Sequence, residues 1–139
     1  MKDSAHKFCL PKKVDSALEL LKSSSFRSKF KLTDRDRQYI QDKGIETIKD
    51  HAFNFINSRI APKFPNNDGK QTPMKGHPVF IAQHATATCC RSCLQKWHTI
   101  QKGRALSDNE IGFLINLIMG WIEKQIGGGE NELIKQQQG

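Results

Sequence analysis

Residues 107–126 read SDNEIGFLINLIMGWIEKQI, and this stretch is the clearest indication of fold class in the chain. Ser107 and Glu110 have the spacing of a capping box, in which each side chain accepts a backbone N–H at the start of a helix. The apolar residues that follow recur at spacings of three and four: Ile111, Leu114, Ile115, Ile118 and Ile122. They share one helical face, so the stretch predicts a long amphipathic helix packed against other helices.

Helical patterns also fill the first half of the chain. Apolar residues at Val14, Leu18 and Leu21 predict a short helix over about 13–24, broken by three serines, and a loop or turn should carry the aromatic and basic residues that follow. Thr33 is a good N-cap for a helix that runs to about residue 43, where Gly44 serves as a C-cap or a kink. A stripe of isoleucines, alanine and phenylalanines predicts a longer helix over 45–60, ended by Pro62.

A long polar loop is expected at about 61–76, where three prolines and two glycines interrupt the helical pattern. Long polar loops within compact domains are often functional. Beyond it, Pro78 suits the first turn of a helix, residues 79–87 fit either a short helix or an extended segment, and Cys90–His98 has a helical pattern.

The fold class is therefore all-α, a small single-domain helical bundle, because no convincing strand or repeat is present. A chain of 139 residues suggests one domain. We expect a basic N-terminal leader with a short helix over 1–25, the helical domain over 26–126 and a disordered Gly/Gln-rich tail over 127–139, with Gly127–Gly129 ending the last helix.

The charge of the chain points to polyanionic partners. The formal net charge is +8, and the stretch from Lys22 to Arg37 holds six Lys/Arg against two Asp/Glu. Such a surface suits the phosphates of a nucleic acid, although a basic pI also simply keeps a small protein soluble. The expected phosphate contacts are Arg27, Lys29, Lys31, Arg35, Lys70, Lys75, Lys96, Lys102 and Arg104.

No secretory signal or membrane-spanning apolar run is visible, so we expect a cytoplasmic protein with no membrane partner. The four cysteines should then be reduced, which favours metal or thiol chemistry over disulfides.

The concentrated chemistry lies in residues 77–98, HPVFIAQHATATCCRSCLQKWH. Cys90 and Cys93 form a C-x-x-C pair at the start of a predicted helix, where one turn brings both thiolates to one metal. We expect Cys90, Cys93 and His84 to ligate a Zn²⁺ ion, with His98 or Cys89 as the fourth ligand and His77 as a further candidate.

Two other interpretations compete with the metal site. Cys90 at a helix N-terminus would have a lowered pKa, and His84 or His98 could act as its base in thiol catalysis. Alternatively, the cysteines pack as small buried hydrophobes and the histidines form ordinary hydrogen bonds. Three cysteines and three histidines within 22 residues are an unusual density for packing alone.

The run from Phe26 to Gln125 resembles a bacterial and phage domain family of unknown function, family 4186. The matching words are NNDGKQTPMKGHPVFIAQHATATCCRSCLQKWH, then KGRALS, then WIEKQ. Gln101 departs from the pattern, which has a proline before Lys-Gly, and this should change only a turn. The resemblance supplies no catalytic residue and no metal. The bacterial and phage setting of the family makes a nucleic-acid function more expected.

Together these features predict a zinc-stabilised basic helical protein that binds nucleic acid. The second hypothesis is an enzyme that uses a metal-bound water or the Cys90 thiolate as nucleophile, with His84 as a further catalytic candidate. The third is a phage or host regulatory module that binds another protein. Oligomeric state does not follow from the sequence.

Overall fold

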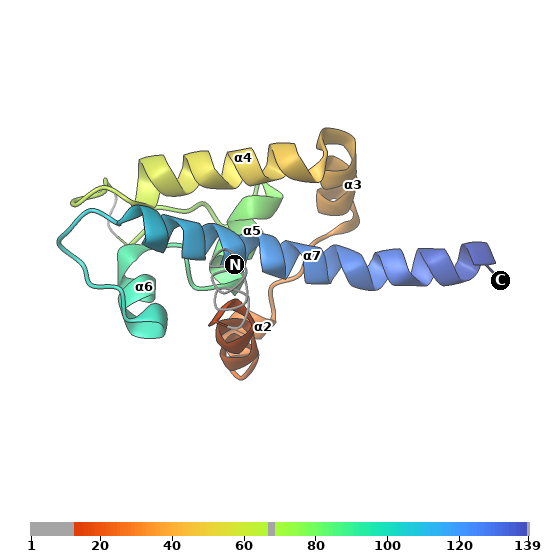
Figure 1. The fold of residues 1–139 in the computed structure, drawn as a ribbon, viewed down its shortest axis with the longest axis horizontal. Coiled ribbons are helices and arrows are strands. Elements are labelled where there is room, and N and C mark those ends of the chain that lie inside the picture. Colours follow the sequence, from red (N-terminus) through yellow and green to blue (C-terminus); the bar gives the residue numbers. More distant parts are fainter. Residues whose placement is uncertain (1–12, 67–68, 139) are drawn as a thin grey trace, which may run out of the picture.

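The structure is a computed structural model that describes residues 13–66 and 69–138, with side chains described up to residue 127. Helices form at residues 13–22 and then at α2 (Ser25–Ser28), α3 (Asp34–Lys43), α4 (Ile45–Phe55), α5 (Pro78–Ala85), α6 (Arg91–His98) and α7 (Asp108–Gln138). The described ranges contain no strand, so the predicted all-α class is confirmed (Figure 1). Among the helices of these ranges, none combines the length and apolarity needed to cross a membrane.

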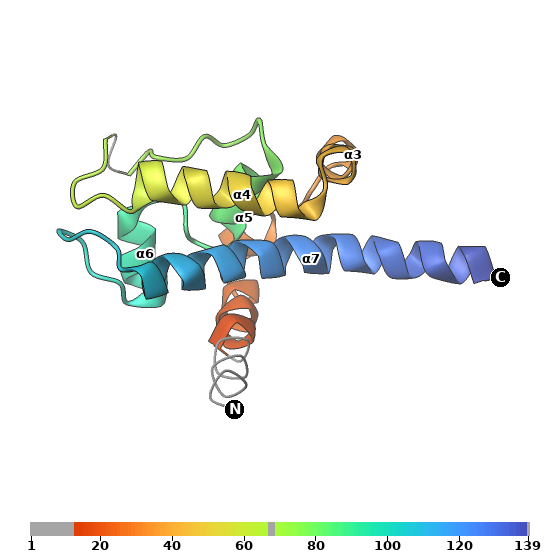
Figure 2. The same cartoon turned by 45° about the horizontal axis from the view of Figure 1, so that its top comes forward.

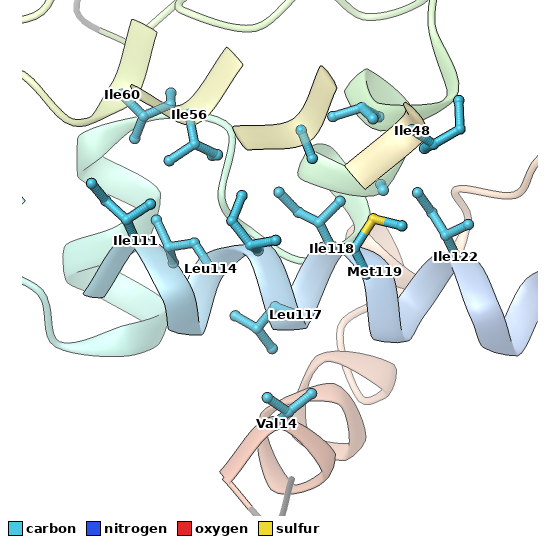
Figure 3. Close-up of a cluster of buried hydrophobic side chains, with 14 of the residues drawn as sticks. Val14, Ile48, Ile56, Ile60, Ile111, Leu114, Leu117, Ile118, Met119 and Ile122 are labelled. Atoms are coloured by element: carbon cyan, nitrogen blue, oxygen red, sulfur yellow. The ribbon is translucent and has the colours of Figure 1, made fainter. Parts of the chain in front are cut away.

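The core lies between α4 and α7, which run side by side in both views of the ribbon (Figures 1 and 2). Ile48 and Ile56 on the α4 side face Leu114, Ile118 and Ile122 of α7, and all five are fully buried (Figure 3). Every apolar position that the sequence placed on one face of the last helix is buried, because the spacing of three and four puts them over the α4 stripe.

On its other side, α7 receives the helix at 13–22. Leu117 points from α7 toward this helix, where Val14 lies (Figure 3). The two helices pack closely at Gly120, where an added Cβ would be in van der Waals contact with a methyl group of Val14 at 3.4 Å and one of Leu18 at 3.5 Å. The helix that the sequence predicted at 13–24 is thus part of the packed domain.

The predicted helix starts are confirmed in their hydrogen bonds. Thr33 and Asp36 form a capping box at α3, and Ser107 and Glu110 form another at α7. Gly44, at φ 90°, ends α3 and begins α4, a left-handed conformation that glycine adopts without steric cost. Pro78 occupies the first turn of α5. Of the two alternatives left open after Pro78, the structure has the helix, which runs to Ala85.

The end of α4 widens into a π-helical turn, η1 (Ile56–Ile60), in which the Ala61 N–H donates to the Ile56 carbonyl five residues earlier. The expected loop follows directly and runs to residue 77, and α5 begins at Pro78. At the entrance to the loop, the Ile60 carbonyl accepts a hydrogen bond from the Arg91 side chain.

Two expectations about elements differ from the structure. The aromatic and basic stretch expected as a loop contains the short helix α2, which Ser24 caps by accepting from the Arg27 N–H. The backbone of α7 does not end at Gly127–Gly129 but stays helical to Gln138, extending past the rest of the domain (Figures 1 and 2). Glycine weakens a helix by about 1 kcal/mol without removing its N–H or clashing, so a flanked run can remain helical. Of the leader predicted over 1–25, residues 1–12 lie outside the described residues.

Candidate metal centre

Three thiols converge at the start of α6. Cys89 and Cys90 lie in the turn between α5 and α6, and Cys93 follows one helical turn later. The Cys93 Sγ lies 3.5 Å from that of Cys89 and 3.2 Å from that of Cys90, and all three sulfurs fall within 4.8 Å of one another. Cys90 is also the N-cap of α6, where its sulfur accepts the Cys93 N–H at 3.4 Å. This cluster could hold a metal ion.

Neighbouring polar side chains hold the backbone of the cysteine turn. Thr72, from the long loop, donates from its hydroxyl to the Cys89 carbonyl at 2.7 Å. Gln83 of α5 donates to the Thr88 carbonyl at 3.1 Å and to the Thr72 hydroxyl at 3.2 Å. Both side chains are buried, so these bonds form away from competing water and place the sulfurs before any ion binds.

A cation from a distant part of the chain completes the cluster. The Arg27 guanidinium donates to the Cys93 sulfur at 3.1 Å and to the Cys89 sulfur at 3.6 Å. It also donates to the His84 carbonyl at 2.7 Å, and its side chain is only 8% exposed. Positive N–H donors aimed at two sulfurs favour the thiolate form that a metal ion requires.

The pKa of two of the three thiols is raised. The pKa of Cys89 is raised chiefly by its hydrogen bond with Cys90, and that of Cys93 chiefly by its hydrogen bond with Cys89; burial adds to both, against the opposing effect of Arg27. A thiol nucleophile needs the reverse shift. The raised pKa values therefore do not favour Cys89 or Cys93 as a nucleophile.

The histidines of the segment lie outside the thiol group and bond elsewhere. The His84 Nε2 donates to the Pro73 carbonyl at 3.0 Å, and the His98 Nε2 donates to the Thr86 carbonyl at 2.8 Å. Burial lowers the pKa of both rings. The structure thus brings together three of the six candidate ligands, and neither ring makes the hydrogen bond to Cys90 that a catalytic base would need.

His77 has a separate role at the start of α5. Its Nδ1 accepts the Val79 N–H at 3.0 Å, and its Nε2 lies 3.0 Å from the Nδ1 of His51. Since Nδ1 is an acceptor, the ring proton is on Nε2, which donates to His51. Burial, and then the charge of His51, lowers the pKa of His77 to about 4.

The candidate phosphate contacts are distributed unevenly. Arg27 is buried beside the sulfurs instead of lying on the surface, since its donors are used there. Arg104 is held by Glu110 at 2.6 Å, and Lys102 donates to the Ser92 hydroxyl. Both of these side chains are exposed, and so are the remaining candidates: Lys29, Lys31, Arg35, Lys70, Lys75 and Lys96.

Sequence reasoning did not find the role of Arg91, which is 1% exposed. Its guanidinium donates to carbonyls of two segments, tying the entrance of the long loop to the turn after α6: Ile60 at 3.2 Å, Pro62 at 3.0 Å, Gln101 at 2.9 Å and Arg104 at 2.8 Å. The available signal was its position on the same face of α6 as buried Leu94, three residues on. No sequence signal pairs Arg27 with the cysteines, because they are more than 60 residues apart.

One family model matches the chain. It is described as a domain of unknown function, DUF4186, and it matches residues 15–123. That range includes the thiol group, Arg27 and Arg91. No solved structure matches the chain.

Proposed function

The chain belongs to the DUF4186 family, a domain family of unknown function, and on this premise we propose that it is a zinc-binding helical protein. The observation that carries the proposal is the convergence of Cys89, Cys90 and Cys93 within 4.8 Å. Thiolates are preferred ligands of Zn²⁺, and a reduced C-x-x-C pair at a helix start is a recurrent half of zinc sites.

The spacing of the sulfurs fits one zinc ion. Two thiolates on a tetrahedral zinc lie about 3.8 Å apart, since each Zn–S bond is about 2.3 Å. The present separations of 3.2 and 3.5 Å need small outward movements to reach that value. Arg27 would remain a hydrogen-bond donor to the ligand sulfurs and offset part of the charge of three thiolates.

The burial of the thiols supports a structural role. Cys89 and Cys90 are 6% and 7% exposed, and the long loop bonds to their turn through Thr72. A bound zinc would join this turn to α6, and its binding free energy would add to folding. A catalytic zinc instead keeps one position open to water or substrate.

Elemental analysis of the untagged protein purified under reducing conditions tests this proposal. We expect about one zinc per chain, lost in Cys90→Ser and Cys93→Ser and retained in Ser92→Ala, an exposed neighbour on α6. Because a ligand variant can fail to fold, the wild-type protein is also treated with a chelator and its thermal unfolding is followed. Full zinc content in both cysteine variants, or a metal-free purified protein whose stability zinc does not change, contradicts the proposal.

Cobalt substitution separates the structural and catalytic alternatives. The visible spectrum of the cobalt protein reports the number of thiolates and the coordination number. A closed four-coordinate site supports the structural role. Three thiolates with an exchangeable water would favour the enzyme, using metal-bound water as nucleophile.

We also propose that the protein binds single-stranded nucleic acid. Support comes from the segment that includes α2, where basic and aromatic residues alternate: Phe26, Lys29, Phe30 and Lys31. Phe26 is 45% exposed, and the Lys29 ammonium lies 4.7 Å from its ring centroid. Exposed aromatic rings beside cations suit stacked bases and the phosphates that link them.

Salt dependence tests the nucleic-acid proposal. The affinity for a single-stranded oligonucleotide should fall steeply as salt concentration rises, because each neutralised phosphate releases counterions. A salt-independent affinity, or no binding at low salt, contradicts it. A protein partner that remains bound after nuclease treatment would favour the regulatory module instead.

A further inference from the structure

A second feature lies on the face of the molecule formed by the helix at 13–22, the α2 segment and α7. A pocket of 250 Å³ opens there. Its lining includes four cations and two aromatic rings: Lys22, Arg27, Lys31, Lys124, Phe30 and Trp121. None of the residues that line it is acidic.

The positive charge of this lining is specific to the pocket. A larger hollow of 330 Å³, lined by other residues of the 13–22 helix, α4 and α7, contains Asp15, Glu46 and Glu123 against one cation, Lys49. Both hollows border α7, so the overall positive charge of the chain does not explain the difference. The 250 Å³ pocket concentrates positive potential where a bound phosphate would lie.

The cations at its rim can be redirected to a ligand. Lys22 pairs with Glu19 at 3.1 Å and Lys124 pairs with Asp15 at 3.7 Å, and both pairs are on the surface. Exposed pairs of this kind contribute about 0–1 kcal/mol, so a phosphate can replace the carboxylates at little cost. Lys31 is exposed and lies on the segment that carries the basic and aromatic residues.

The floor of the pocket is apolar and aromatic. Leu18 and Leu21 are buried there, and Trp121 is half-buried against the core. One face of Phe30 is occupied, since it stacks on His84 at 5.5 Å. A base would find aromatic partners in the lining at Trp121 and Phe30, and the lysines offer donors to its attached phosphate.

We propose that this pocket binds one nucleotide of a single-stranded nucleic acid, with the base against Trp121 and the phosphate between Lys31 and Lys124. The proposal rests on the nucleic-acid binding proposed above and assigns it a place. Arg27 lines this pocket and also bonds to the thiols, so the two sites share a residue.

Tryptophan fluorescence tests the assignment directly. The chain has two tryptophans, and Trp97→Phe leaves Trp121 as the reporter. Titration with single-stranded oligodeoxythymidylate should quench its emission, and thymidine monophosphate should do so with weaker affinity, while inorganic phosphate should bind without quenching. Oligouridylate in a parallel titration compares RNA with DNA.

Charge reversal provides the second measurement. Lys31→Glu/Lys124→Glu should weaken oligonucleotide binding about tenfold or more beyond the matched control Lys43→Glu/Lys49→Glu, which makes the same charge change at exposed lysines outside the candidate phosphate contacts. Circular dichroism checks that both variants are helical, and Lys31→Gln/Lys124→Gln replaces the first if it does not fold.

The outcomes separate the two proposals. Oligonucleotide binding without Trp121 quenching, weakened equally by both double variants, overturns the pocket and leaves nucleic-acid binding in place. Quenching by the mononucleotide without oligonucleotide binding supports the pocket for free nucleotides and overturns nucleic-acid binding. No binding of either probe at low salt overturns both.

Discussion

The Arg27 guanidinium donates a hydrogen bond to the Cys93 sulfur at 3.1 Å, across a separation of 66 residues in sequence. This bond connects α2, near the beginning of the domain, to the helix that carries the thiols. It makes Arg27 part of the candidate metal centre, although the sequence placed it among the surface contacts for phosphate.

Arg27→Lys should weaken zinc binding. Lysine keeps the positive charge, but one ammonium cannot reproduce the planar fork that reaches two sulfurs and the His84 carbonyl. Loss of such an outer partner typically costs about 10- to 100-fold in metal affinity. Competition with a chromogenic chelator measures the affinity, with Arg35→Lys as the exposed control. Equal affinity in the two variants would show that the Arg27 bonds do not act on the metal.

Arg91→Lys should destabilise the protein without a direct effect on the thiols. A buried lysine cannot serve all four carbonyls that Arg91 bridges, and unsatisfied buried carbonyls are costly. We expect a loss of about 3 kcal/mol in the free energy of unfolding, measured by urea denaturation. The exposed Arg35→Lys change should stay within about 0.5 kcal/mol. A similarly small change for Arg91→Lys would contradict the proposed bridging role.

Acid should weaken the start of α5 through His77. The unfolded chain protonates this ring below about pH 6.5, whereas the folded protein, in which its pKa is about 4, resists protonation. The contribution of His77 to the free energy of unfolding is therefore fully present above about pH 6.5 and is lost as the pH falls toward 4. Asp36 opposes the shift, and His51 reinforces it.

His77→Asn isolates this effect, because asparagine is a strong N-cap and does not titrate. Between pH 7 and pH 4.5 the wild-type protein should lose about 1–3 kcal/mol more stability than the variant. Thermal unfolding across this range measures the difference, and acid effects on His84 and His98, which do not contact His77, are common to both proteins. Parallel stability curves for the two proteins would exclude His77 as the source.

Gly120→Leu should disturb the docking of the helix at 13–22. A side chain at this position meets Val14 and Leu18, whereas one at Gly112, on the same helix, has nothing within 4 Å. Overpacking of this kind costs about 1–3 kcal/mol. Gly112→Leu is the matched control and should be neutral or stabilising, since leucine favours a helix over glycine. If both variants unfold at the same temperature, the helix at 13–22 does not pack closely at Gly120.

Most of the helical bundle could be predicted from local patterns. Apolar spacing of three and four placed the faces of α4 and α7, and capping residues at Thr33 and Ser107 placed two helix starts. These features depend on residues within one or two turns of each other, so they can be recognised without tertiary information. The expected stop at Gly127–Gly129 differs from the structure because glycine lowers helix propensity without preventing the backbone bonds.

The candidate site likewise has a part that local sequence predicts and a part that only the tertiary structure decides. The three thiols lie within five residues of one another, and a helix start brings such neighbours together, so the sequence was sufficient to name all three as candidate ligands, although it ranked His84 above Cys89. Arg27 and Thr72 reach the cluster only through the packing of α2 and the long loop against it. The ring nitrogens of His84 and His98 bond to carbonyls because folding places those acceptors beside them. Short-range order thus follows from residue spacing, whereas the partners of each polar side chain depend on long-range packing, which satisfies buried donors and acceptors wherever the fold places them.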